Sequence, residues 1–449
     1  MITDNFKNRK AGKKTDMLKK IGVVSLGCSK NTVDTEEMLG ELVSYGFEIV
    51  SDASEAEIII VNTCGFIESA KTDSLDTILE MAEYKKNGKC KLLAVTGCLS
   101  QRYPDELPPE LPEVDLFWGV KNYPAFAKKL AEICGRTRVC GAVPERVLTT
   151  PPFRAYLRIA DGCDNRCTYC AIPLIRGGRV SIPMEKLIEE AKGLAKRGVT
   201  ELTVIAQDTS AYGIDLYGEP RLAQLLTELA KIDGFHWIRL LYTYPNTVNE
   251  ELIDTIRDNP KLCNYIDMPI QHISVKMLEN MNRHGSAEHI RHIVDYIRKS
   301  APDFILRTTV MLGFPSETEE DFNELMEFIE EHPFDRIGAF TFSPEDGTKA
   351  FDMPDQIDHE TAQRRFDTLM RRQMEISYGF NKKRIGTTVE ALVEAVEGDC
   401  AYCRSYAEAA DVDGLIKIKL NGNENVKAGN YVQVKITSAD YYDLNGELI

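Results

Sequence analysis

The sequence lacks any hydrophobic run long enough to span a membrane. Crossing a bilayer takes about 20 consecutive apolar residues, and the apolar runs here, such as Ile58–Val61, are far shorter. Residues 1–20 are basic, with 7 Lys and Arg against 2 Asp and hence a charge of 7 − 2 = +5, but no apolar stretch of signal-peptide length follows them. We therefore expect a flexible basic tail over residues 1–20, no membrane partner and a cytoplasmic protein.

The sequence is also short of positive charge. It contains 54 Lys and Arg against 70 Asp and Glu, which gives a formal net charge of 54 − 70 = −16. Broad nucleic-acid binding depends on neutralising phosphates, so a chain this acidic is a poor candidate for it. An acidic surface favours a basic partner instead.

The length of 449 residues predicts about three domains, and the content of 43% hydrophobic and 28% charged residues is typical of globular proteins. Residues 21–140 alternate short apolar strands, over 21–28, 57–64 and 91–98, with helical patterns. This alternation predicts a domain with a parallel α/β sheet. The Pro- and Thr-containing residues 141–152 are expected to form a linker.

Two further domains are predicted after this linker. Residues 153–384 contain six candidate strands separated by helical patterns, too few for a closed eight-stranded barrel. We therefore expect a partial (βα)6 barrel with its chemistry at the carboxyl ends of the strands. Residues 385–449 alternate apolar and polar positions between turns, which predicts a small antiparallel β-barrel. The overall fold class is α/β.

Twelve cysteines in such a chain point to metal binding or catalysis, because a reducing compartment disfavours structural disulfides. Cys163, Cys167 and Cys170 form the tight triplet C-x3-C-x2-C directly after a candidate strand. Three thiolates can bind three irons of a 4Fe–4S cluster and leave the fourth iron open to a small molecule. The alternative is zinc, which normally takes four Cys or His ligands, and no fourth ligand is evident nearby in the sequence. Cys400 and Cys403 are interpreted as ordinary strand thiols.

With this triplet the sequence resembles the radical S-adenosylmethionine superfamily. The resemblance implies that the open iron binds the amino and carboxylate groups of S-adenosylmethionine. One electron then cleaves the sulfonium to a 5′-deoxyadenosyl radical, which removes a hydrogen from an unactivated C–H bond. Tyr169 matches the family's aromatic position, whose backbone lies near the adenine; ordinary packing beside the cluster is the alternative role for its side chain.

A second set of cysteines follows the first three candidate strands. Cys28, Cys64 and Cys98 each end one strand. In a parallel sheet these strand ends lie along one edge, so the three thiols can converge there and bind a second metal centre. The alternative is three unrelated buried thiols.

The sequence segments around both cysteine sets resemble those of the methylthiotransferases of this superfamily, and the last domain resembles their TRAM domain. The resemblance implies an auxiliary 4Fe–4S cluster on Cys28, Cys64 and Cys98, which carries the sulfur that is methylated and then inserted at carbon. The implied cofactors are therefore two 4Fe–4S clusters and S-adenosylmethionine. The segments that carry the resemblance are SLGCSKNTVDTEEMLG (25–40), NTCGFIESAKTDSLDTILE (62–80), TGCLSQRY (96–103) and ADGCDNRCTYCAIPLIRGGRVS (160–181).

Two branches of the family are candidates, one acting on isopentenyl-adenosine in tRNA and one on the β-carbon of an aspartate in ribosomal small-subunit protein twelve. The last domain carries 5 Lys and Arg against 11 Asp and Glu, 5 − 11 = −6, which suits a basic protein better than tRNA. Acidic surfaces also occur simply because they keep a protein soluble. A metal-binding module on the ribosome or RNA without catalysis is the alternative of another class. The electron donor and the sulfur source are left open. The segments GCSKN, NTCGFIESAK, AIPLIRGG and ELTVIAQDTSAYGIDL resemble the ribosomal branch more than the tRNA branch.

Several polar residues are candidates for contacts to the cofactor or substrate. Gln207 and Asp208 end the second strand of the partial barrel, where related enzymes contact S-adenosylmethionine, although they could also cap the following helix. Arg307 could pair with a carboxylate of cofactor or substrate, or close a structural ion pair. Gly313 is expected to shape a turn near the nucleoside of the cofactor. Arg176 and Arg179 follow the cluster loop and could contact substrate or lie in solvent.

Overall fold

The computed structural model describes residues 18–422 and 425–449, and the chain divides into two compact units. The first unit contains the residues up to Thr150 together with Cys170–Gly178, and the second contains Pro151–Tyr169 and Arg179–Ile449. Most of the predicted basic tail, residues 1–17, lies outside the described residues. Among the described residues, no helix combines the length and apolar character needed to cross a membrane.

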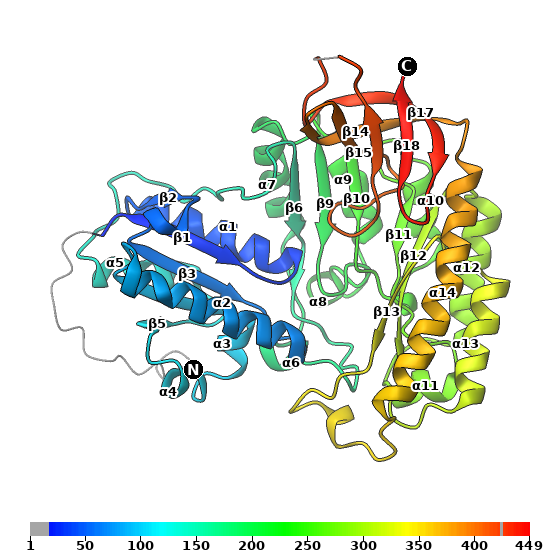
Figure 1. Ribbon diagram of the computed structural model, residues 1–449, viewed down its shortest axis with the longest axis horizontal. Helices are drawn as coiled ribbons and strands as arrows, with labels where there is room; N and C mark the ends of the chain where they lie inside the picture. Colours follow the sequence, from blue (N-terminus) through cyan, green and yellow to red (C-terminus); the bar gives the residue numbers. More distant parts are fainter. Residues whose placement is uncertain (1–17, 423–424) are drawn as a thin grey trace. The chain divides into compact units, whose positions relative to one another are not determined.

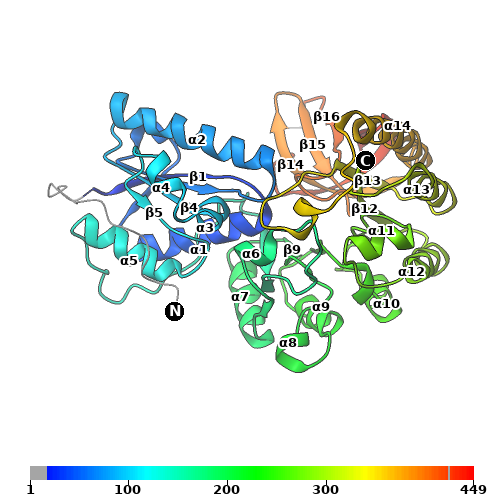
Figure 2. The same cartoon turned by 90° about the horizontal axis from the view of Figure 1, so that it is seen from below.

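The first unit is built on a parallel sheet with strand order β2-β1-β3-β4-β5, which confirms the predicted α/β sheet. Every residue of β3 and β4 is buried, because helices cover both faces of the sheet. Ile58 and Ile60 pack with α1 and α5, whereas Ile59 and Val61 pack with α2 on the opposite face (Figure 2). The strands are β1 (Lys20–Ser25), β2 (Glu48–Val50), β3 (Ile58–Thr63), β4 (Leu92–Gly97) and β5 (Leu116–Phe117), and the helices are α1 (Ser29–Ser44), η1 (Ala53–Glu55), α2 (Glu68–Asn87), α3 (Cys98–Arg102), α4 (Leu107–Glu110), α5 (Tyr123–Ile133) and α6 (Ile172–Ile175).

The stretch predicted as a linker is held to the first unit as far as Thr150. The buried carboxylate of Glu36 in α1 accepts hydrogen bonds from Arg146 and from the backbone N–H and hydroxyl of Thr149. These hydrogen bonds keep residues 146–149 packed on α1. The prediction of a linker over residues 141–152 did not include such contacts.

The centre of the second unit is a set of six parallel strands with helices along their outer side (Figures 1 and 2). They form two three-stranded sheets, β6-β9-β10 and β11-β12-β13, which a parallel bridge between Ile238 and Leu262 connects. The predicted partial barrel of six strands is thereby confirmed. Its strands are β6 (Arg154–Arg158), β9 (Glu201–Ile205), β10 (Trp237–Leu240), β11 (Tyr265–Asp267), β12 (Ile305–Leu312) and β13 (Arg336–Thr341), with the short pair β7 (Ala160–Asp161) and β8 (Val180–Ser181); its helices are α7 (Met184–Lys196), α8 (Ile214–Tyr217), α9 (Leu222–Ala230), η2 (Pro245–Thr247), α10 (Glu250–Arg257), α11 (Val275–Asn280), α12 (Ala287–Ser300), α13 (Glu319–Glu331), η3 (Lys349–Asp352) and α14 (His359–Lys383).

The C-terminal residues form a closed five-stranded barrel in the order β14-β15-β16-β18-β17. The predicted small barrel is confirmed, but one pair of neighbours differs from the antiparallel expectation, because β16 and β18 run parallel. Val393, Ile416 and Ile436 contribute to its apolar core. The strands are β14 (Thr388–Glu397), β15 (Cys400–Arg404), β16 (Ile416–Lys419), β17 (Tyr431–Ala439) and β18 (Leu444–Leu448).

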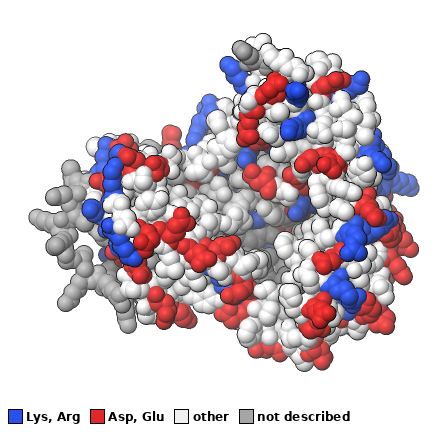
Figure 3. Space-filling model, in the orientation of Figure 1, with Lys and Arg blue, Asp and Glu red and all other residues white. Residues whose placement is uncertain are grey.

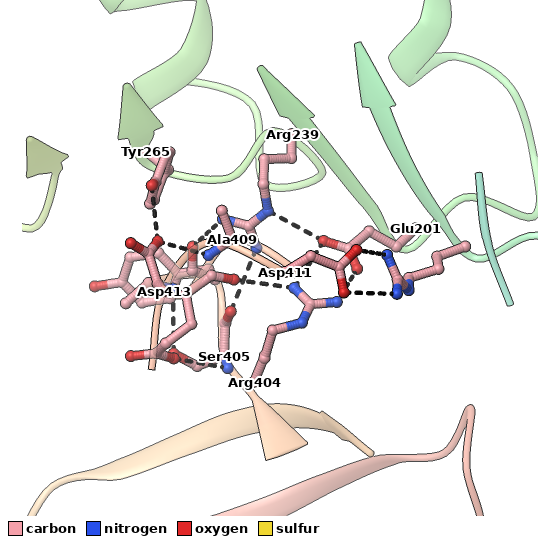
Figure 4. A network of polar contacts seen from close by, with 12 residues as sticks. Glu201, Arg239, Tyr265, Arg404, Ser405, Ala409, Asp411 and Asp413 are labelled. Atoms are coloured by element: carbon pink, nitrogen blue, oxygen red, sulfur yellow. Dashed lines mark hydrogen bonds and ion pairs between the residues drawn. The ribbon is translucent and has the colours of Figure 1, made fainter. Parts of the chain in front are cut away.

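A buried network of charges joins this small barrel to the six parallel strands (Figure 4). Glu201 of β9 accepts hydrogen bonds from Arg239 of β10 and Arg404 of β15, and all three side chains are only 1% exposed. Arg154 of β6 forms an ion pair with Asp411 in the loop after β15. These contacts explain why the small barrel belongs to the second unit rather than forming a unit of its own.

Candidate functional site

Three cysteines of the first unit meet at the carboxyl edge of its sheet. Cys28 follows β1 and precedes α1, Cys64 comes directly after β3, and Cys98 follows β4 as the first residue of α3. The thiols of Cys28 and Cys64 lie close enough to Cys98 to influence its ionisation. The structure therefore brings this predicted set together.

Glycines beside these cysteines allow the three loops to approach one another. A Cβ added to Gly27 would lie 3.3 Å from the Sγ of Cys64, and one added to Gly97 would lie 2.4 Å from the Oδ1 of Asn62. Both glycines have positive φ angles, +90° and +102°, which side chains disfavour. A Cβ on Gly65 would lie 2.7 Å from the backbone of Leu99. The donor set is three thiols on closely packed turns, which suits a cubane cluster with one open iron.

Asn31 and Arg176 link the three cysteine loops. The amide nitrogen of Asn31 donates to the carbonyl oxygens of Leu26 and Thr63, 2.9 Å away in each case. Its Oδ1 accepts a hydrogen bond of 2.8 Å from Arg176 and lies 3.5 Å from the Sγ of Cys98. One amide group thus contacts residues beside Cys28 and Cys64 and the thiol of Cys98 itself.

The surroundings of Cys64 and Cys98 favour the protonated form of these two thiols. Burial raises the pKa of Cys98 to about 12, although the charge of Arg176 opposes this shift. Burial also raises the pKa of Cys64. Iron binds the thiolate, so loading this site must release protons.

The C-x3-C-x2-C motif follows the short strand β7. Cys163 and Cys167 belong to the second unit, after β7, and Cys170 begins the segment that belongs to the first. Burial raises the pKa of Cys163 to about 11. Arg283 lies 3.9 Å from the Sγ of Cys167 and donates to the hydroxyl of Tyr169 at 3.1 Å.

A single metal ion fits neither cysteine set well. Within residues 18–422 and 425–449, no three side chains of His, Cys, Asp or Glu surround a point in the way that one ion requires. In a cubane each thiolate binds a different iron, so its ligands need not share one metal atom.

Two of the predicted cofactor residues lie in one apolar cluster or beside it. The ring of Tyr169 packs edge-on against Phe314, with 6.4 Å between the ring centroids. Gly313 directly precedes Phe314, at a φ of +71°, and its backbone N–H donates to the buried carboxylate of Glu317. A Cβ on Gly313 would lie 2.4 Å from the Cβ of Ala362 in α14, so the turn packs directly against that helix.

Gln207 and Asp208 lie in the loop after β9. Gln207 donates its amide hydrogen to Asp161, while its Oε1 is buried without a hydrogen-bond partner among the described residues. Asp208 is buried and accepts hydrogen bonds from Asn165 and from the backbone N–H of Ala211. Asp208 therefore stabilises the turn that follows it, and Gln207 has a free acceptor.

The three arginines named from the sequence all form ion pairs. Arg307 donates to Asp267 at 2.7 Å, and Arg179 lies 3.6 Å from Asp208. Arg176 forms a 2.6 Å ion pair with Asp34 and is only 2% exposed. The alternative that Arg176 lies in solvent is wrong, because the segment after Cys170 packs into the first unit.

Sequence reasoning missed Asn31, Asp34, Arg283 and Tyr244. Asn31 directly follows the Ser-Lys pair after Cys28, so its place beside a cysteine was the available signal. The ring of Tyr244 stacks on the guanidinium of Arg283 at 4.4 Å. Nothing in the local pattern around Arg283 marks it as a neighbour of Cys167.

Three family models match the chain in the order of its domains. Residues 20–119 match the uncharacterized protein family UPF0004, residues 157–329 the radical SAM superfamily, and residues 385–449 the TRAM domain. A radical SAM domain implies a 4Fe–4S cluster and S-adenosylmethionine as cofactors.

The curated relatives extend over nearly the whole chain. A protein of Clostridioides difficile named ribosomal protein uS12 methylthiotransferase RimO is 48% identical, over 96% of this chain and 99% of the relative. Proteins with the same name from Acetivibrio thermocellus and Geobacter sulfurreducens are 47% and 46% identical, each over 96% of this chain and 99% and 98% of the relative.

Among solved structures, the radical S-adenosylmethionine methyltransferase TsrM from Kitasatospora setae has a similar fold. The TM-score is 0.52 at 13% identity, and the match covers 73% of this chain and 72% of TsrM. The similarity at this identity concerns the fold alone.

Proposed function

The chain belongs to the RimO family of radical SAM methylthiotransferases, and from this premise we propose that it adds a methylthio group to the β-carbon of an aspartate in ribosomal protein uS12. The single observation that carries the proposal is identity of 46–48% to proteins of that name over at least 95% of the chain. A ribosomal substrate implies a cytoplasmic enzyme. The electron donor and the sulfur source are not part of the proposal.

We assign each cysteine set to one 4Fe–4S cluster. Cys163, Cys167 and Cys170 bind the cluster that, with S-adenosylmethionine, supplies radical chemistry, and Cys28, Cys64 and Cys98 bind an auxiliary cluster for sulfur transfer. The second assignment is supported by the convergence of the three thiols and by the close approach of their loops at Gly27, Gly65 and Gly97.

The second unit supplies the contacts to S-adenosylmethionine in this proposal. The buried Oε1 of Gln207 would accept a hydrogen bond from a donor of the bound cofactor, because a buried acceptor without a partner is costly. The turn at Gly313 and the backbone of Tyr169 would lie beside the nucleoside of the cofactor. Asp208 and Arg307 act indirectly, by fixing the loop after β9 and by holding Asp267.

Charge supports a basic protein as the substrate. The residues 385–449 of the TRAM domain carry 5 − 11 = −6 charges. In the view of Figure 3, the blue Lys and Arg atoms at the top of the molecule, where this domain lies, are mixed with red Asp and Glu atoms. A net negative charge suits the basic side chains of a ribosomal protein better than the phosphates of tRNA.

The decisive experiment is an anaerobic reaction of reconstituted enzyme with S-adenosylmethionine and either uS12 or tRNA containing isopentenyl-adenosine. Mass spectrometry is expected to find the added methylthio mass on uS12 alone. Methylthiolated tRNA with unmodified uS12 would overturn the proposal in favour of the other branch. A protein that binds zinc and consumes no S-adenosylmethionine would make it a metal-binding module instead.

Variants of the two cysteine sets separate the two clusters. Cys167→Ala is expected to abolish formation of 5′-deoxyadenosine, whereas Cys64→Ala is expected to spare cleavage and abolish the product. Cys400→Ala is the control, a partly buried thiol of β15 outside both sets, and should retain both reactions. Methylthiolated product from Cys64→Ala would exclude the auxiliary site.

A further inference from the structure

The side chain of Arg176 is buried beside a predicted ligand of the auxiliary cluster. Its Nη2 lies 3.7 Å from the Sγ of Cys98, 2.8 Å from the Oδ1 of Asn31 and 2.6 Å from the carboxylate of Asp34. The arginine belongs to the segment Cys170–Gly178, whose Ala171 also packs against Cys98.

The buried ion pair between Arg176 and Asp34 is not explained by stability alone. An ion pair removed from water gains little net stability, and an apolar pair of similar volume often replaces it without loss. Here the side chains of Arg176 and Asp34 are each 1% exposed. The same Nη2 atom contacts the carboxylate and the thiol, and the charge of Arg176 acts on Cys98 more strongly than the opposing charge of Asp34.

Asn31 extends the influence of Arg176 to the other two cysteine loops. Its Oδ1 is fixed by Arg176, which orients its amide nitrogen toward the carbonyl oxygens of Leu26 and Thr63. Leu26 lies two residues before Cys28, and Thr63 directly precedes Cys64. A single guanidinium thus supports the geometry of all three cysteines.

We propose that Arg176 is a positioning residue for the auxiliary cluster, which holds Asn31 and Cys98 in place and sets a fixed positive charge against the Cys98 thiolate. The inference rests on the auxiliary cluster proposed above. A nearby positive charge favours the reduced cluster, which carries one more electron than the oxidised one. Removal of Arg176 therefore lowers the reduction potential of this cluster, and loosens its ligands.

The test uses the full chain with Cys163, Cys167 and Cys170 replaced by Ala, so that the auxiliary cluster alone is titrated. In this background the double variant Asp34→Asn/Arg176→Met removes both charges and leaves no buried charge unpaired. A redox titration followed by electron paramagnetic resonance is expected to show at least a tenfold loss in the equilibrium constant for one-electron reduction, about 59 mV. Arg176→Lys keeps the charge and is expected to retain a potential close to that of the background.

The matched control is Glu36→Gln/Arg146→Met, which removes another buried ion pair of α1, one that binds Thr149 instead of a cysteine. It is expected to change stability but not the potential. If the background binds no 4Fe–4S cluster, the auxiliary cluster itself is refuted. If it binds one and Asp34→Asn/Arg176→Met has the same iron content and potential, only the role of Arg176 is refuted. If Asp34→Asn/Arg176→Met loses iron at an unchanged melting temperature and Arg176→Lys retains it, the positioning role is supported. If Arg176→Lys loses iron as well, the positioning role is overturned.

Discussion

At the scale of single residues, the close approach of the cysteine loops depends on Gly97. Gly97 adopts a φ of +102° and a ψ of −163°, a region that is essentially restricted to glycine. An added Cβ would also lie 2.5 Å from the carbonyl oxygen of Thr63, next to Cys64. Gly97→Ala is expected to destabilise the protein by about 1–3 kcal/mol for the backbone alone, and to separate the loops of Cys64 and Cys98. Urea unfolding and the iron content of the reconstituted protein measure the two effects.

Gly135→Ala is the matched control for that variant. Gly135 has a φ of +66°, but a Cβ there would meet nothing within 4 Å. It should therefore lose about 1–2 kcal/mol of stability and no iron. Equal iron contents in the two variants would contradict the role of close loop packing at Gly97.

At the scale of elements, the turn between β12 and α13 is fixed against α14. Gly313→Ala brings a Cβ to within 2.4 Å of the Cβ of Ala362, so the turn must move away from the helix. Because this turn is proposed to line the nucleoside of the cofactor, the affinity for S-adenosylmethionine is expected to fall at least tenfold, about 1.4 kcal/mol. Anaerobic equilibrium dialysis measures this affinity.

Gly218→Ala provides the comparison for this turn. Gly218 has a similar φ of +79° and open space around it. Its substitution should cost stability without changing the affinity for S-adenosylmethionine. An unchanged affinity in Gly313→Ala would place the nucleoside elsewhere.

The helices and strands were largely predictable, because each depends on the alternation of apolar and polar residues that are near one another in the sequence. The helical pattern expected between the strands 57–64 and 91–98 is α2 (Glu68–Asn87), and the two strands are β3 and β4. The contacts of polar residues were not predictable, because they depend on segments far apart in the chain. Arg176 and its partner Asp34 are separated by 142 residues, so neither position reveals the other. The parallel pairing of β16 with β18 is likewise a property of the closed barrel rather than of either strand.

At the scale of the whole second unit, the carboxylate of Glu201 is one of the groups that hold the TRAM barrel to the parallel strands. Although burial opposes ionisation, the charges of Arg404 and Arg239 lower the pKa of Glu201 to about 2. Glu201→Gln leaves the buried guanidinium of Arg239 without its counter-charge and leaves Arg404 paired with Glu394 alone, which is expected to cost about 3–5 kcal/mol in urea unfolding. The control Glu330→Gln breaks the exposed pair with Arg372, and should cost less than about 1 kcal/mol.

The same carboxylate predicts how attachment of the TRAM barrel depends on pH. The pKa of Glu201 rises from about 2 in the folded protein to its ordinary value of 4.5 on unfolding, so its contribution is complete above pH 4.5 and is lost as the pH falls toward 2. A shift of this size corresponds to about 3 kcal/mol. Trp237 of β10 packs against Tyr431 of β17 with 5.0 Å between ring centroids, so its fluorescence reports attachment. Between pH 4.5 and 2 the wild type is expected to lose more stability than Glu201→Gln, and parallel curves for the two proteins would rule out Glu201 as the titrating group.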